Sequence, residues 1–237
     1  VTPVESMSLL YATRASEPGV VACFGIKNQL PAAALPAGRT GEFLNLIKPV
    51  FPQFIAAENV WTTSINNLNP IVHPPMVLFN AGRIEATGGQ DWNLYADGAT
   101  ESVCKVMLGM DAERMSLLKK ISGDGIAFKN AFENLYAQYC LEKKSLSETL
   151  RQSPIHGDSA MLAPASVNTR YLNEDLPFGL APWSSIGRMW DLPTPKVDAV
   201  IQIASTMTEV DYFTAGLTVD DLGIKGMSPE DVKVLIG

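Results

Sequence analysis

The sequence predicts a mainly α-helical protein that opens with a shorter segment of mixed α/β structure. Two observations lead to this fold class. From Asn66 onward, apolar residues recur mostly at helical spacing, and the long run 101–121 has a continuous apolar face. Before Asn66, short apolar runs such as Val20–Ile26 have the length of buried strands and flank a single amphipathic helix.

The composition is that of a folded, acidic protein. Its 237 residues are 46% hydrophobic and 18% charged, which is enough apolar material for a packed core in one large domain or two small ones. The net charge is -7. Nucleic-acid binding normally requires a basic surface, so this charge argues against a nucleic-acid partner.

Cysteine content and hydropathy favour a cytoplasmic protein. Cys23, Cys104 and Cys140 are odd in number and have no metal-ligand spacing, which is typical of free thiols in a reducing compartment. No apolar run reaches the roughly 18 residues that a membrane-spanning helix needs, and no signal-peptide pattern is present. We therefore expect no membrane partner and no metal site.

The first 63 residues are expected to form short strands and one helix. Thr40 is expected to cap this helix, which has Glu42 in its first turn and continues to about Val50. Four short apolar runs are interpreted as strands or strand-like segments: 7–13, 20–26, 54–56 and 60–63.

The remaining chain is expected to be helical. The expected helices are 69–84, 101–121, 128–139, a short one after Ser145, 183–191, 197–207 and a last one after Ser228. Asn69 is expected to cap the first of them, with Pro70 in its first turn. Pro74 and Pro75 are expected to interrupt or kink that helix. Residues 92–95 are interpreted as a short strand or loop between glycine-rich turns.

One stretch concentrates charge directly before a proline and a glycine: Asn-Thr-Arg-Tyr-Leu-Asn-Glu-Asp-Leu-Pro-Phe-Gly-Leu, residues 168–180. Pro177 disfavours helical backbone at the residue before it, so a helix carrying Arg170 is expected to end near Asp175. The end of the helix would direct the Arg170 and Asp175 side chains toward the element that packs against it. The alternative interpretation is a solvated helix end in which Arg170 pairs with Glu174, four residues on.

His73 is the expected partner of Asp175, because the chain has only two histidines. An aspartate paired with a histidine fixes the imidazole tautomer and stabilises the imidazolium, so the other ring nitrogen can exchange protons near neutral pH. Arg170 offers a planar donor group suited to a substrate carboxylate. The second histidine, His156, lies in a loop rich in serine, proline and glycine, and we expect it to be exposed.

The stretch 168–180 resembles a signature of the octopine/nopaline (opine) dehydrogenase family. The stretch Asn-Pro-Ile-Val-His-Pro-Pro at 69–75, followed by 80–85, resembles a second signature of the same family in the same order. The resemblance extends from the first residues to about Ile224. It implies reductive condensation of an amino acid amine with an α-keto acid such as pyruvate, with NADH or NADPH as the cofactor.

The resemblance also implies roles for individual residues. His73 resembles the catalytic histidine of the family, Asp175 its carboxylate partner, and Arg170 the clamp on a substrate carboxylate. Thr13 would line the opposite wall of the cleft, where the family often has a cysteine. Asn69 would hydrogen-bond substrate, or else only cap its helix.

By the same resemblance, residues 1–63 are the C-terminal part of an α/β, Rossmann-type nucleotide-binding domain, and 64–237 form the helical substrate and catalytic domain. The glycine fingerprint G-x-G-x-x-G, which lets backbone approach a pyrophosphate, does not occur in the sequence. The nearest match, at 123–125, follows a helix and lacks the third glycine. We therefore expect a C-terminal portion of a longer enzyme that binds cofactor poorly by itself, with its cofactor-binding residues unassigned.

Two other functions stay open. A neighbouring dehydrogenase of the same architecture would reduce a keto acid to a hydroxy acid without using an amine. The missing fingerprint favours instead a non-catalytic substrate-binding or dimerisation module. The sequence does not decide between NADH and NADPH, or between a monomer and a homodimer.

Overall fold

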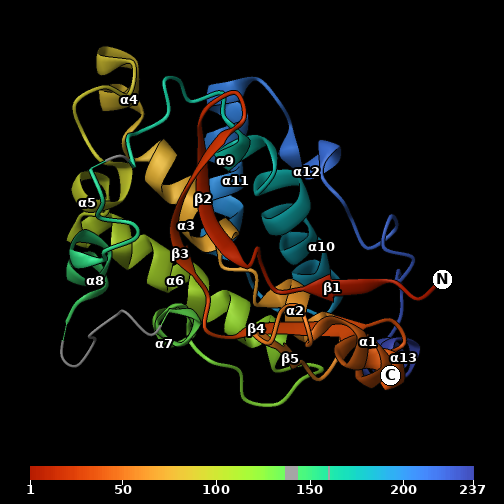
Figure 1. Cartoon of the computed structure of the whole chain (residues 1–237). Coiled ribbons are helices and arrows are strands. Elements are labelled where there is room, and N and C mark those ends of the chain that lie inside the picture. The colour runs from red at the N-terminus through yellow and green to blue at the C-terminus, as the bar shows by residue number, and fades with distance from the viewer. Residues whose placement is uncertain (137–143, 160) are drawn as a thin grey trace.

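The computed structural model describes residues 1–136, 144–159 and 161–237 (Figure 1). Two small β-sheets formed by the first 56 residues lie against a bundle of helices formed by the rest of the chain. Tyr139, at the end of the expected helix 128–139, and Cys140 lie outside the described residues.

The first sheet has the strand order β1-β4-β5. β1 (Val4–Ser6) runs antiparallel to β4 (Leu30–Ala34), which runs parallel to β5 (Phe54–Ala56). The second sheet is a hairpin of β2 (Tyr11–Glu17) and β3 (Val20–Ile26). The expected strand at 20–26 therefore exists, but its expected burial is wrong.

The hairpin is exposed because it has only two strands and packs on the helices through one face. Val21 keeps 62% of its surface exposed, whereas Ala12 and Phe24 contact the core. Gly19 occupies the hairpin turn with φ of +83°, a conformation that glycine adopts without strain.

The helices begin with two that flank the first sheet and continue into the bundle. Their bounds are α1 (Thr40–Ile47), α2 (Val60–Ile65), α3 (Asn69–Leu78), α4 (Ala81–Thr87), α5 (Leu94–Gly98), α6 (Glu101–Leu118), α7 (Phe128–Leu135), α8 (Leu146–Gln152), α9 (Arg170–Asn173), α10 (Ala181–Met189), α11 (Pro195–Thr208), α12 (Tyr212–Ala215) and α13 (Pro229–Ile236). A 3-10 turn, Ala37–Arg39, precedes α1, and one turn of π-helix, Leu176–Leu180, follows α9. No described helix has both the length and the hydropathy to cross a membrane.

Two expectations for the N-terminal segment are wrong. Residues 60–63 form the start of α2 rather than a strand, because the Asn59 side chain accepts a hydrogen bond from the Thr62 backbone N–H at 3.0 Å and so begins a helix. Thr40 lies inside α1 rather than at its cap. Its hydroxyl donates to the Ala37 carbonyl at 2.8 Å and accepts from the Ala34 N–H at 3.0 Å.

Helix α3 passes through both internal prolines without interruption. Asn69 is its first residue, so Leu68 rather than Asn69 takes the capping position, and the break before α4 falls after Leu78 instead of at the prolines. Each proline removes a helix hydrogen bond, a cost of about 3 kcal/mol or more. The fully buried Ile71, Met76 and Val77 each contribute roughly 1.5–3 kcal/mol, which offsets that cost.

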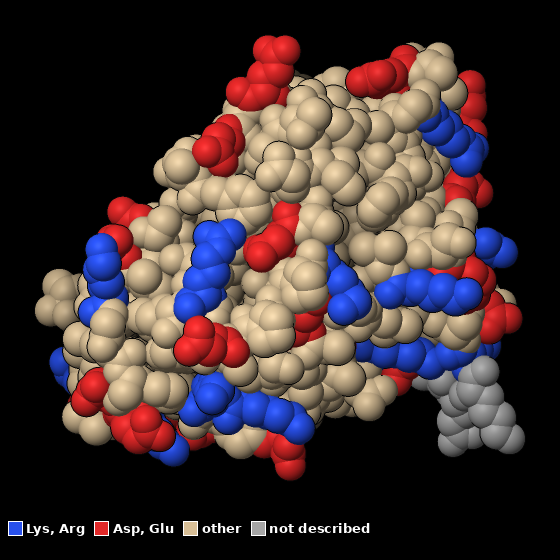
Figure 2. Space-filling view, turned by 180° about the vertical axis from the view of Figure 1, so that it is seen from behind, with Lys and Arg blue, Asp and Glu red and all other residues tan. Residues whose placement is uncertain are grey.

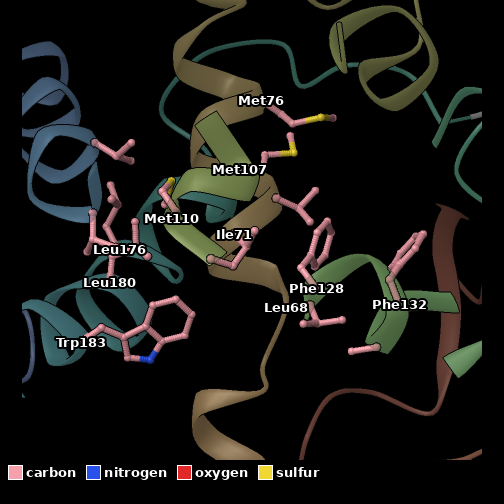
Figure 3. Packing of buried hydrophobic residues seen from close by; sticks show 14 of the residues in the cluster. Leu68, Ile71, Met76, Met107, Met110, Phe128, Phe132, Leu176, Leu180 and Trp183 are labelled. Atoms are coloured by element: carbon pink, nitrogen blue, oxygen red, sulfur yellow. The ribbon is translucent and has the colours of Figure 1, made fainter. Parts of the chain in front are cut away.

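The core is centred on α3 and α6. Figure 3 shows Ile71 and Met76 beside Met107 and Met110, with Leu176, Leu180 and Trp183 to one side and Phe128 and Phe132 to the other. Met107 and Met110 of α6 are fully buried in this core, and Met115 packs against it. The face of the molecule in Figure 2 carries Lys and Arg interspersed with Asp and Glu, so this face has no continuous basic surface.

Candidate active site

The structure brings together His73 from α3 and Asp175, which lies between α9 and the turn of π-helix. The His73 Nδ1 and Asp175 Oδ2 atoms are 2.7 Å apart, and the two side chains are only 12% and 11% exposed. An ionised carboxylate only accepts hydrogen bonds, so Nδ1 carries the proton and Nε2 of the neutral ring carries the lone pair. This is the tautomer that a general base requires.

The turn of π-helix positions Asp175. α9 ends at Asn173, close to where Pro177 predicts, and the Leu180 N–H then donates to the Asp175 carbonyl five residues back, at 3.0 Å. A Cβ atom at Gly179 would lie 2.3 Å from Cγ of Pro70, so only glycine allows this turn to approach the first turn of α3 so closely. Single π-turns are frequent at functional sites.

Two tyrosines complete the surroundings of the imidazole. The Tyr95 hydroxyl lies 3.0 Å from Nε2 of His73, and burial raises the pKa of Tyr95 well above its ordinary value. Tyr95 therefore stays neutral and donates to Nε2. The Tyr171 ring stacks on the imidazole with centroids 4.3 Å apart, and its hydroxyl accepts a 3.3 Å hydrogen bond from Arg14 of β2.

His156 is not the exposed loop histidine that the sequence analysis expects. Its ring packs against those of Tyr95 and Phe132, each with a centroid separation of 4.9 Å. The Asn93 side chain holds the loop in place by donating to the His156 carbonyl at 3.1 Å. Burial, and then the charges of His73 and Lys27, lower the pKa of His156 to about 3. His156 is therefore neutral near pH 7.

A small cavity of about 60 Å³ lies between the N-terminal segment and the helices. Its polar lining residues come from both parts of the chain: Ser8, Lys27, Asn69, His73, Tyr95, Tyr136 and His156. This volume corresponds to about two water molecules.

Comparison with known proteins identifies the family. Residues 56–208 match the family described as NAD/NADP octopine/nopaline dehydrogenase, alpha-helical domain. The chain belongs to this family. It is 34% identical over 233 residues to an opine dehydrogenase from Arthrobacter sp. (strain 1C), a match that covers 98% of this chain and 63% of that protein.

Solved structures of octopine dehydrogenase share the fold. The one with NADH and L-arginine aligns with a TM-score of 0.75 at 17% identity, over 100% of this chain and 65% of the other. The one with NADH and pyruvate aligns with a TM-score of 0.67 at 16% identity, over 100% and 64%. The likeness confirms the predicted fold class. The chain spans less than two thirds of the length of each of these relatives.

The three residues predicted to bind substrate in this opine dehydrogenase family member do not contact the His73–Asp175 pair as closely as Tyr95 and Tyr171 do. Asn69 lines the cavity one helical turn before His73. Arg170 is 64% exposed, with its Nε atom 3.8 Å from the Glu174 carboxylate, because Tyr171 occupies the side of α9 that faces His73. Thr13 is exposed on β2, opposite Cys23, and does not line the cavity. Substrate binding by these residues stays a prediction.

Lys27, Tyr95 and Tyr171 are site residues that the sequence analysis did not identify. Tyr171 lies in the stretch 168–180, so the same motif that points to Asp175 also contains it. Lys27 and Tyr95 have no comparable sequence signal, because the hairpin and α5 bring them to the cavity only in the folded chain.

Nicotinamide dinucleotide is the cofactor named for the family, and the described residues offer no binding site for its pyrophosphate. A second cavity close to the site has a volume of about 510 Å³, within the usual range for ligands, and lies between β5 and the ends of α2, α6 and α7. No lysine or arginine lines it, so it offers no cation to a pyrophosphate. The glycine fingerprint is also missing from the sequence. Among the described residues, no group of three His, Cys, Asp or Glu side chains could hold a metal ion.

Proposed function

We propose that this chain is the catalytic part of an opine dehydrogenase that joins the amine of an amino acid to an α-keto acid by reductive condensation. The observation that carries the proposal is the buried His73–Asp175 pair, at the place where both family signatures meet. The solved octopine dehydrogenases support the substrate classes, because their names include NADH with L-arginine and NADH with pyruvate.

The two-part organisation is proposed on the same basis. Residues 1–63 would be the C-terminal part of the nucleotide-binding domain, and 64–237 the helical domain. NADH or NADPH would supply the hydride when bound, and its pyrophosphate would be held by residues outside these 237. The greater length of the relatives supports this assignment. A cytoplasmic location stays a prediction from the sequence, and a homodimer stays one of the two oligomeric states left open.

His73 would carry the protons of the condensation. Nε2 accepts a proton from the ammonium group of the amino acid, which frees the amine to attack the carbonyl carbon of the keto acid. The attack forms the C–N bond, and a proton passes from the nitrogen to the carbonyl oxygen to give a hydroxyl group. His73 then returns its proton to this hydroxyl group, which leaves as water while the C–O bond breaks and the C=N bond forms. Asp175 stabilises the imidazolium between these steps by holding Nδ1–H at 2.7 Å. A substrate that reaches Nε2 replaces the Tyr95 hydroxyl there.

Turnover by the full-length protein tests the proposal. Cofactor oxidation would be followed at 340 nm with pyruvate and a panel of amino acids, for the parent and His73→Ala. We expect oxidation to need both acids and to fall about a hundredfold or more without His73, a typical contribution of general acid–base catalysis. Lys105→Ala, at an exposed position of α6, is the control and should keep parental activity.

Other results would favour the alternatives. Oxidation with the keto acid alone would indicate a dehydrogenase that forms a hydroxy acid. Binding of an amino acid or keto acid without any turnover, in the parent as well as in the variant, would indicate a substrate-binding module.

A further inference from the structure

Lys27 is a buried cation in the same cavity as His73. It directly follows β3, and only 5% of its surface is exposed. Its backbone N–H donates to the Leu10 carbonyl at 3.0 Å, which closes the hairpin. Its Nζ atom donates to the Leu9 carbonyl and lies 5.1 Å from the ring centroid of Tyr136.

The Lys27 ammonium has no counter-ion among the described residues. Of its three N–H donors, one has the Leu9 carbonyl as acceptor, and the Tyr136 ring adds a cation–π contact. No described carboxylate forms an ion pair with Nζ. Burying a charge without a partner costs several kcal/mol, so an anion that entered the cavity would remove part of this cost.

The charge of Lys27 persists at neutral pH. Burial lowers the pKa of Lys27 to about 8, so most of the side chains are still protonated at pH 7. The described residues that line the cavity with it include no aspartate or glutamate. Burial raises the pKa of Tyr136 to about 12 and lowers that of His156 to about 3, so both are neutral.

We propose that Lys27 binds a carboxylate of an acid substrate and holds it within the cavity that His73 lines. The proposal rests on the proposed function, in which both substrates are acids. The keto acid carries its carboxylate on the reacting carbonyl carbon, and the amino acid carries it on the carbon bonded to the reacting amine. His156 contacts the cavity beside both residues, so Lys27 and His73 act on one small space. Because Lys27 belongs to the N-terminal segment and His73 to the helices, a bound acid would lie between the two parts.

Steady-state kinetics of the full-length protein test this inference with two variants. Lys27→Met keeps the length and apolar stem of the side chain but removes its charge, whereas Lys27→Arg keeps the charge. We expect Lys27→Met to raise the KM of one acid by about 10- to 100-fold, as for loss of a charge-assisted hydrogen bond, with a smaller change in kcat. Lys27→Arg should restore much of the affinity. Lys105→Met is the matched exposed control.

The arms of the experiment identify which carboxylate is bound. A rise in the KM of pyruvate alone assigns the keto acid, and a rise in the KM of the amino acid alone assigns the amino acid. In the second case, the amine that lacks the α-carboxylate should react equally well with parent and Lys27→Met. If the parent turns over both acids and Lys27→Met leaves both KM values within twofold, the inference is wrong while the proposed function stands.

Titration calorimetry with pyruvate and with the amino acids of the panel covers the case in which the parent shows no turnover. Binding to the parent that is lost in Lys27→Met and kept in Lys27→Arg supports the inference even without catalysis. Equal binding to parent and Lys27→Met, or no binding of any of these acids to the parent, overturns it. A melting temperature close to that of the parent is required of each variant, so that unfolding is not mistaken for lost binding.

Discussion

At the scale of single residues, the charge of Asp175 is the feature that prepares His73 for proton transfer. Asp175→Asn keeps the shape of the side chain but removes the charge that stabilises the imidazolium, and its amide can favour the wrong tautomer. We expect kcat of the full-length protein to fall about a hundredfold or more, with little change in melting temperature. Glu174→Gln, one residue earlier and 61% exposed, is the control and should keep parental kcat. Equal kcat for parent and Asp175→Asn would exclude the proposed role.

Sequence patterns identify some residues of this site and miss others for a physical reason. His73 and Asp175 were predictable because histidines are rare in the chain and because Pro177 marks the end of a helix. Arg170 was expected to point the same way as Asp175, but neighbouring helical residues point about 100° apart, and Tyr171 takes the inner side of α9. Lys27 depends on how the hairpin docks, which no local pattern encodes.

At the scale of elements, predictions hold where a capping signal and an apolar period agree. Helices α8 and α13 begin directly after Ser145 and Ser228, as expected, and each serine forms a capping box in the structure. Predictions fail where packing outweighs local preference. α2 is helical despite its β-branched residues because Trp61 and Ile65 are buried, and α3 continues through Pro74 and Pro75 for the same reason.

The turn of π-helix approaches α3 so closely at Gly179 that there is no room for a larger side chain. In Gly179→Ala, the added Cβ would lie 2.3 Å from the rigid ring of Pro70, so the turn or the helix must shift. We expect a loss of unfolding free energy of about 1–3 kcal/mol, typical of overpacking, together with a fall in kcat as Asp175 moves relative to His73. Thermal unfolding and turnover of the full-length protein measure the two effects.

Gly82→Ala is the matched control for this substitution. Gly82 lies inside α4, and a Cβ atom there would have no atom within 4 Å. Alanine should therefore stabilise the helix by roughly 0.5–1 kcal/mol and leave kcat unchanged. If Gly179→Ala were as stable and as active as the parent, the close approach would not position Asp175.

At the scale of the whole molecule, one apolar core joins the N-terminal segment to the helices. Met7, Leu10 and Leu30 belong to the same buried cluster as Trp61 and the residues of α3 and α6. Sequence periodicity identified the members of this core on α6 and α7, but not its continuity with the strands, since long-range packing leaves no periodic signal. The boundary after residue 63 is therefore a proposed division of the chain that crosses a shared core.

The buried ion pair of Arg114 and Asp111 on α6 connects this core to the cavity. Arg114, fully buried, donates to Asp111 Oδ1 at 2.7 Å and to the Ile126 carbonyl at 3.0 Å, and it also bonds to Asn66. Asp111 Oδ2 accepts from the Phe128 N–H at 2.7 Å, at the start of α7, whose last turn lines the cavity.

Arg114→Met would leave the Asp111 carboxylate buried without its cation. We expect a loss of about 3–5 kcal/mol in the free energy of unfolding, a large fraction of the 5–15 kcal/mol of a typical domain, measured by urea unfolding followed through tryptophan fluorescence. Lys119→Met, which breaks an exposed pair with Asp124 near the end of the same helix, should leave the midpoint unchanged. The double variant Arg114→Met/Asp111→Asn should lose less than the sum of the two single variants, because it removes the unpaired charge. If the losses of unfolding free energy were strictly additive, the two side chains would stabilise the fold independently rather than as a pair.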